Sequence, residues 1–188
     1  MLDERRSPRG EQDEQSQQKE ERAILQCTRQ FYLEIEKEEW KFDALYDLYD
    51  LMTVRQVVVY CNSSQGVEWV AGRMRAKDHT VSAVHDEMEE IERDAAIRDF
   101  RCGISELFVT ACTFSNALLF SNMRVVVNYD LPTQVESYID RFGPHRQFGR
   151  GDIAVNFVLA SEMSMLRQIE QFYHTEIPEL LSNINDLF

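Results

Sequence analysis

The stretch QVVVYCN, residues 56–62, decides the fold class. It is a continuous, mostly β-branched run, and two serines follow it before the next helical pattern. Strands buried on both faces of a parallel sheet have continuous apolar sequences of this kind, whereas strands with one face in water alternate between apolar and polar residues. The stretch therefore predicts an inner strand of a parallel sheet, followed by a polar loop and a helix cap.

Strand-like and helix-like segments alternate on both sides of this stretch. Strand patterns occupy residues 30–35, 56–62, 80–88, 105–113, 123–132 and 152–160, and amphipathic helical patterns occupy residues 40–52, 63–78, 89–103 and 161–174. The first strand alternates as an edge strand does, Gly103 is placed to end a helix, and Ser161 is placed to begin one. Repeated strand–helix units predict an α/β fold, with an open parallel sheet covered by helices on both faces.

The composition indicates one folded domain with a flexible end. Residues 1–22 are rich in Gln, Glu and Arg with few apolar residues, which predicts disorder, and the folded domain is expected to span residues 23–188. No apolar run reaches the length of a membrane span, and no hydrophobic segment follows the N-terminal charges as in a secretory signal. The expected location is therefore intracellular, in the cytoplasm, the nucleus or both.

The chain is acidic, with a net charge of −13. Residues 1–22 contain five basic and seven acidic residues, so a net charge of −11 remains on the rest. A field of this sign repels phosphates, and RNA is expected to bind weakly or not at all. The four cysteines and four histidines lie at no metal-ligand spacing, so no metal site is expected.

Several segments resemble a known family. They are EEWKFD (38–43), VVVYCNS (57–63), IERD (91–94), VNYDLP (127–132), YIDRFG (138–143) and AVNFV (154–158). Together they are similar to the C-terminal RecA-like domain of DEAD-box RNA helicases of the translation initiation factor four-A branch, over about residues 28–188. The resemblance implies a RecA-like sheet. It implies ATP and Mg²⁺ as cofactors only alongside an N-terminal RecA domain, because this chain has neither G-x-x-x-x-G-K-[ST] nor D-E-A-D.

Most positions that the resemblance assigns to ATP chemistry are altered. In the family loop T-T-D-x-x-A-R-G-x-D, the arginine is replaced by Asn116 and the ATP-side aspartate by Leu119. In the family loop H-R-x-G-R-x-x-R-x-G-R, the histidine is Asp140, and the two arginines on the γ-phosphate are Pro144 and Gln147. An arginine finger is worth about 10³–10⁵ in rate, so losing both arginines is expected to abolish ATP turnover.

Other family positions are kept. The resemblance implies RNA contacts for Asn62, Arg93 and Thr110, and residual phosphate contacts for Arg141 and Arg150. Structural roles are the alternatives. Arg141 and Arg150 can pair with acidic neighbours such as Asp140 or Asp152, Asn62 can cap the next helix, and Arg93 can pair with Glu89 or Glu90.

The run ACTFSNALLF, residues 111–120, is apolar where the family loop is polar. Phe114, Leu118, Leu119 and Phe120 either collapse into the core or form an exposed patch for a protein partner, and both interpretations stay open.

Together these features predict a catalytically inactive DEAD-box-like domain, with no catalytic residue assigned, that acts as a protein-interaction module in translation, mRNA processing or RNA silencing. The expected partner is a helical-repeat scaffold of the initiation factor four-G type or a short peptide motif. One alternative is the C-terminal half of an ATP-dependent RNA helicase that works with an N-terminal RecA domain. Another is a competitor that occupies the partner of an active helicase.

Overall fold

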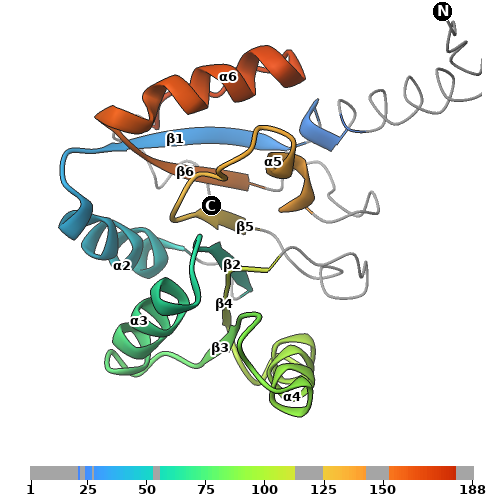
Figure 1. The fold of residues 1–188 in the computed structure, drawn as a ribbon. Coiled ribbons are helices and arrows are strands. Elements are labelled where there is room, and N and C mark those ends of the chain that lie inside the picture. The colour runs from blue at the N-terminus through green and yellow to red at the C-terminus, as the bar shows by residue number, and fades with distance from the viewer. Residues whose placement is uncertain are drawn as a thin grey trace, which may run out of the picture.

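The computed structural model describes residues 21, 24–26, 28–52, 56–112, 125–142 and 153–180 (Figure 1). Within these ranges, parallel strands form one sheet in the order β1-β6-β5-β2-β4-β3. The strands are β1 (Arg29–Ile35), β2 (Val57–Tyr60), β3 (Val81–Val84), β4 (Leu107–Thr110), β5 (Val125–Asn128) and β6 (Ile153–Leu159). The helices are α2 (Lys41–Leu51), α3 (Ser64–Arg75), α4 (Glu90–Arg101), α5 (Ser137–Asp140) and α6 (Met163–Tyr173), with 3-10 turns η1 (Glu38–Trp40) and η3 (Ala160–Glu162). The predicted α/β fold is confirmed.

Strand β2 lies inside the sheet, as its sequence predicts. It pairs with β4 on one side and β5 on the other, and all four of its side chains are buried. Val57 and Val59 belong to the apolar cluster on one face, and Val58 and Tyr60 belong to the cluster on the other. Successive strand residues point to opposite faces, so a strand covered on both sides needs an apolar residue at every position.

The helices divide between the two faces of the sheet. Leu45 of α2 and Val70 of α3 pack in one cluster, whereas Phe100 of α4, Tyr138 of α5 and Leu166 of α6 pack in the other. Figure 1 shows α6 lying along β1 and β6, with α3 and α4 near the opposite edge of the sheet. Both faces are therefore covered, as expected for repeated strand–helix units.

The ends of the elements confirm two local predictions and correct one. Strand β1 is an edge strand, and Gly103 follows α4 with a φ of 73°, the left-handed conformation that glycine adopts without steric cost. The expected cap at Ser161 is wrong. Ser161 lies inside η3, and the Glu162 side chain accepts the Leu159 N–H at 3.0 Å instead, because the chain enters α6 through a 3-10 turn.

The parallel sheet also places the loops that matter for function. All the paired strands run in one direction, so the residues after β2, β4 and β5 gather at the same carboxyl edge. None of the helices in the described ranges is long and apolar enough to cross a membrane. Apart from Glu21, the tail expected at residues 1–22 lies outside the described residues.

Candidate functional site

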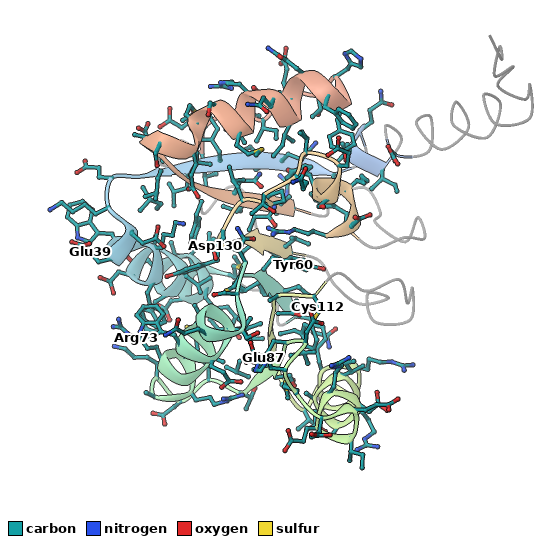
Figure 2. All side chains as sticks on the ribbon, in the orientation of Figure 1. Glu39, Tyr60, Arg73, Glu87, Cys112 and Asp130 are labelled. Atoms are coloured by element: carbon teal, nitrogen blue, oxygen red, sulfur yellow. The ribbon has the colours of Figure 1, made fainter. Side chains whose placement is uncertain are left out.

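The candidate site lies at the carboxyl edge of the sheet, where β2, β4 and β5 end. The loop after β2 supplies Asn62, the loop after β5 supplies Asp130, and the segment after α5 supplies Arg141. Figure 2 labels Tyr60, Cys112 and Asp130, which come from the ends of these three strands. Residues from three separate parts of the sequence therefore meet around Asn62, Asp130 and Arg141.

Arg141 is the centre of this edge. Its residue surface is only 6% exposed. One terminal nitrogen donates to Asn128 Oδ1 at 3.0 Å and to the Asp130 carbonyl, and the other donates to Asn62 Oδ1 at 2.8 Å. The guanidinium carbon lies 5.2 Å from the centre of the Tyr60 ring. Burial lowers the pKa of Arg141 below its ordinary value, but the guanidinium stays charged at neutral pH.

The partners of Arg141 differ from those that the sequence suggests. A carboxylate such as Asp140 is its expected partner, whereas the bonds above go to amide and carbonyl oxygens at the ends of β2 and β5. Asp140 is the last residue of α5. Although the residue as a whole is exposed, its carboxyl is partly shielded from water, which raises its pKa above the ordinary value.

Asn62 is held in place by the same edge. Its Nδ2 donates to the Leu131 carbonyl at 2.7 Å, and its backbone N–H donates to Asp130 Oδ2 at 2.9 Å. The alternative interpretation of Asn62 as a helix cap is wrong, because Ser63 caps α3 by accepting the Gly66 N–H at 3.0 Å. The amide of Asn62 instead joins the loops after β2 and β5.

The hydrogen bonds continue from this edge into the sheet. Asn128 Nδ2 donates to Asn156 Oδ1 at 2.7 Å, and Asn156 Nδ2 donates to the Tyr138 hydroxyl at 3.2 Å. The Tyr138 hydroxyl donates in turn to Gln30 Oε1 at 2.9 Å. We call the residues Asn62, Asn128, Arg141, Asn156, Tyr138 and Gln30 the Arg141 network. All of them except Asn62 are buried, and buried polar groups that are paired in this way fix one arrangement of the strands.

A second polar cluster surrounds Lys41, and sequence reasoning missed it. The Lys41 ammonium is 3.1 Å from Glu38, 3.1 Å from Asp130 and 3.8 Å from Glu162, and its side chain is only 1% exposed. Burial lowers the pKa of Lys41, but the charges of Asp130 and Glu162 and two hydrogen bonds outweigh burial and raise it overall. A lysine at the start of an amphipathic helix is normally exposed, so nothing in its local pattern marked it.

The residues after β3 form a separate group. Arg93 of α4 donates to the carbonyls of Asp86 and Met88, at 3.3 and 3.2 Å, rather than to the carboxylates of Glu89 or Glu90 that the sequence suggests. Its buried Nε has no hydrogen-bond partner among the described residues. The arginine therefore holds the loop after β3 through backbone oxygens, since its side chain turns back along that loop.

Thr110, at the end of β4, is fully buried. Its hydroxyl accepts the Cys112 N–H at 3.0 Å, and Cys112 Sγ donates to Asp86 Oδ1 at 2.9 Å. Burial and the neighbouring Asp86 raise the pKa of Cys112 to about 11, so the group stays a thiol at neutral pH. Thr110 therefore has a local structural role in this structure.

Several predicted site residues cannot be placed. Asn116, Leu119, Pro144, Gln147 and Arg150 lie outside the described residues, as do the patch residues Phe114, Leu118 and Phe120. Of the predicted residues that are described, Asn62 and Arg141 are in contact, whereas Arg93 lies on α4 and Thr110 lies at the end of β4. In the described ranges, no group of three or more His, Cys, Asp or Glu side chains could hold a metal ion.

Comparisons with known proteins agree with this geometry. The model of the helicase conserved C-terminal domain matches residues 40–144. The ATP-dependent RNA helicase eIF4A of Neosartorya fischeri is 41% identical over 169 residues, which cover 90% of this chain but only 42% of the relative. The chain thus spans about two fifths of the length of the curated relatives it matches.

Solved structures are similar as well. The Dbp5 C-terminal domain of S. cerevisiae, bound to Gle1 and IP6, has a TM-score of 0.71 and 27% identity, and the match covers 81% of this chain and 88% of that chain. S. cerevisiae Dbp5 bound to RNA and ADP BeF3 has a TM-score of 0.73 and 26% identity, over 81% of this chain and 41% of that one. The chain therefore belongs to the helicase conserved C-terminal domain family, as a RecA-like domain of the DEAD-box, eIF4A type with altered motifs.

Proposed function

We propose that this chain is a catalytically inactive DEAD-box-like C-terminal domain that acts as a protein-interaction module in RNA metabolism, in the cytoplasm or the nucleus. The observation that carries the proposal is the bonding of the residues kept from the family. Arg141 is buried, and its guanidinium donates to Asn62 and to two other protein oxygens. Both side chains are engaged with the fold, and the buried guanidinium of Arg141 is not displayed for a ligand.

The residues of this chain also fit a nucleotide poorly. Pro144 and Gln147 stand where the family has the two γ-phosphate arginines, and neither can supply a cationic fork to a phosphate. The nearby Arg141 is committed to Asn62 and Asn128, so it cannot replace them without opening the Arg141 network. We therefore assign no ATP or Mg²⁺ site to this chain alone, and a role for them would require a paired N-terminal RecA domain.

A protein partner is supported by the similar structures. A Dbp5 C-terminal domain bound to Gle1, and a Dbp5 bound to Nup159 and Gle1, share this fold. The Dbp5 C-terminal domain therefore binds a protein with this fold, and the acidic balance of the present chain disfavours RNA as its main partner. The partner we propose is a helical-repeat scaffold of the initiation factor four-G type or a short peptide motif.

The test of inactivity adds an N-terminal RecA domain to this chain and measures ATP hydrolysis. The N-terminal RecA domain of eIF4A is mixed with, or fused to, this chain, and RNA-stimulated ATP hydrolysis is measured against the same domain alone. The eIF4A C-terminal domain, supplied in the same two ways, is the positive control. We expect this chain to give no turnover above the N-terminal domain alone. RNA-stimulated turnover comparable to the control would contradict an inactive module.

A second measurement addresses the partner. Calorimetric titration of the purified chain with a helical-repeat domain of the initiation factor four-G type is expected to show saturable binding that persists at physiological salt. Tight RNA binding at that salt, with no binding of the scaffold or of short peptides, would overturn the proposed role.

One alternative function has a specific observation in its favour. The similar curated proteins are ATP-dependent RNA helicases, and this chain matches only 42% of their length. The chain would then be the C-terminal half of a helicase. In that case the fused protein would hydrolyse ATP, and the double substitution Pro144→Arg, Gln147→Arg would change the rate little.

A further inference from the structure

A hollow opens beside the carboxyl edge, between η1 and the first turns of α3. Its volume is about 470 Å³, within the range of about 300–1,000 Å³ that is usual for ligand pockets. Glu38 and Glu39 of η1, Trp69 of α3, and Tyr129 and Asp130 after β5 line it. We call it the η1–α3 hollow. The residues that line the hollow include no member of the Arg141 network and no position that is altered from the family motifs.

The charge of the hollow has one sign. Its lining includes three carboxylates, Glu38, Glu39 and Asp130, and the residues that line it include no lysine or arginine. Two cations adjoin the lining: Arg73 lies over Trp69, and Lys41 already pairs with the carboxylates of Glu38, Asp130 and Glu162. Two cations beside the four carboxylates of Glu38, Glu39, Asp130 and Glu162 leave the area negative, so a further cation would be attracted and a phosphate would be repelled.

The aromatic wall selects among cations. Trp69 keeps 47% of its surface exposed although it packs edge-on against Phe42, with ring centres 5.5 Å apart. Arg73 shows that this wall accepts a guanidinium, since its guanidinium carbon lies 5.0 Å from the Trp69 ring centre and 4.1 Å from that of Phe42. Planar guanidinium groups stack on indole rings and pair with carboxylates through two hydrogen bonds, whereas an ammonium is compact and strongly hydrated.

From these features we infer that the η1–α3 hollow binds an arginine side chain carried by a basic segment of a partner protein. The aliphatic part of the arginine packs on the apolar wall, the guanidinium stacks on Trp69, and Glu38 and Glu39 accept its hydrogen bonds. The net charge of −13 draws such a segment toward this chain. The inference adds a binding site to the proposed protein-binding role. It rests on that role only for the statement that the arginine belongs to a protein.

The test uses a nine-residue glycine–serine peptide with three arginines, together with versions that carry lysine or glutamate at the same positions. Binding to the full chain is followed by the NMR signals of the two indole N–H groups, since Trp40 and Trp69 are the only tryptophans. We expect a saturable shift of the Trp69 signal with the arginine peptide, weaker binding of the lysine peptide, and none of the glutamate peptide.

Substitutions distinguish binding in the hollow from attraction by the net negative charge of the whole protein. Replacing Glu38 and Glu39 with glutamine is expected to weaken arginine-peptide binding about tenfold, a change of about 1.4 kcal/mol. The matched control replaces Glu87 and Glu92 with glutamine. Both are exposed, and Figure 2 shows Glu87 well apart from Glu39. This control removes the same charge and is expected to change the affinity less than about twofold.

Two further variants keep the test decisive. Because Glu38 also pairs with Lys41, Glu39→Gln alone is measured as a variant that leaves that cluster intact. Trp69→Leu keeps an apolar wall but removes the π face, and it should lower affinity about three- to fivefold for arginine. Equal losses in the site variant and the control, an unchanged affinity in Trp69→Leu, or the absence of saturable binding would each overturn the inference. If the scaffold still binds in those cases, the proposed function stands without it.

Discussion

The Arg141 network and the η1–α3 hollow lie at the same edge of the sheet, yet they differ in how their polar groups are satisfied. In the network, each charged or amide group faces a protein partner within hydrogen-bond distance, and Arg141, Asn128 and Asn156 are buried. In the hollow, Glu39 is exposed, Glu38 is exposed although it pairs with Lys41, and Trp69 presents about half of its surface. Inherited polar residues that find partners inside the fold stabilise it, whereas groups left facing water remain available to a ligand.

The largest expected effect comes from opening the network. Arg141→Met should lower the free energy of unfolding by about 3 kcal/mol, because Asn128 would keep a buried oxygen without its charged donor and Asn62 would lose its bond to the loop. Urea unfolding at pH 7 measures this. The matched control is Arg98→Met, an exposed arginine on α4, for which a change within about 0.5 kcal/mol is expected.

The variant Arg141→Lys tests whether the stability comes from the charge of Arg141 or from its planar hydrogen-bonding geometry. It keeps the charge but cannot donate to Asn62 and Asn128 from one planar fork, so it should recover only part of the loss. A loss below about 1 kcal/mol for Arg141→Met would mean that the network contributes little to stability, and the contrast with the hollow would then fail.

Lys41 gives the next largest effect. Lys41→Met leaves three carboxylates without their shared cation, and we expect a loss of about 2 kcal/mol at pH 7, less than for a fully buried pair because the carboxylates are partly exposed. The pKa of Lys41 is raised in the folded protein, so its contribution is fully present below the ordinary value of 10.5 and is lost as pH rises through the raised value.

The pH dependence isolates that contribution. Wild-type stability should fall above about pH 10.5, and the Lys41→Met variant should fall less steeply over the same range. Buried Tyr60 and Tyr138 also have raised pKa values and add to the alkaline loss in both proteins, so the difference between the two slopes is the informative quantity. Identical slopes would contradict a raised pKa for Lys41.

Tyr60→Phe should have a smaller effect of the opposite sign. The Tyr60 hydroxyl is buried and has no hydrogen-bond partner among the described residues, so removing it should stabilise the protein by up to about 1 kcal/mol. The ring that Arg141 lies over is retained. Thermal and urea unfolding measure the change. A loss of stability would instead reveal a partner for this hydroxyl.

The smallest effect is expected in the hollow. Glu39→Gln should change the free energy of unfolding by less than about 0.5 kcal/mol, because Glu39 is an exposed residue on a 3-10 turn. The same variant should weaken arginine-peptide binding. A large loss of stability would place Glu39 in the supporting structure of the fold and would remove the contrast between the two regions.

The fold could be predicted from the sequence because its information is local. The continuous run at 56–62 required an inner strand, the alternation at 30–35 required an edge strand, and helical spacing placed the amphipathic helices. The spacing of apolar residues indicates which face of each helix or strand is buried, and that spacing can be read from residues that are neighbours in the chain. The RecA-like fold and its family were therefore predicted correctly.

The candidate site could be predicted only in part. Aligned positions nominated Asn62 and Arg141 as remnants of a ligand site, but these two side chains bond to each other although they are 79 residues apart in the sequence. Lys41 gave no signal, since a helical lysine is ordinarily exposed and its burial depends on carboxylates from three other elements. Hydrogen-bond partners and burial are set by how the strands and loops meet.

The sequence by itself thus determined the sheet and its inner and edge strands. Only the tertiary structure decided that Arg141 serves the fold and that η1 and α3 enclose an acidic, aromatic hollow. The physical reason is the range of the forces involved. Apolar periodicity acts within one element, whereas a buried charge is stable only when partners from several elements converge on it.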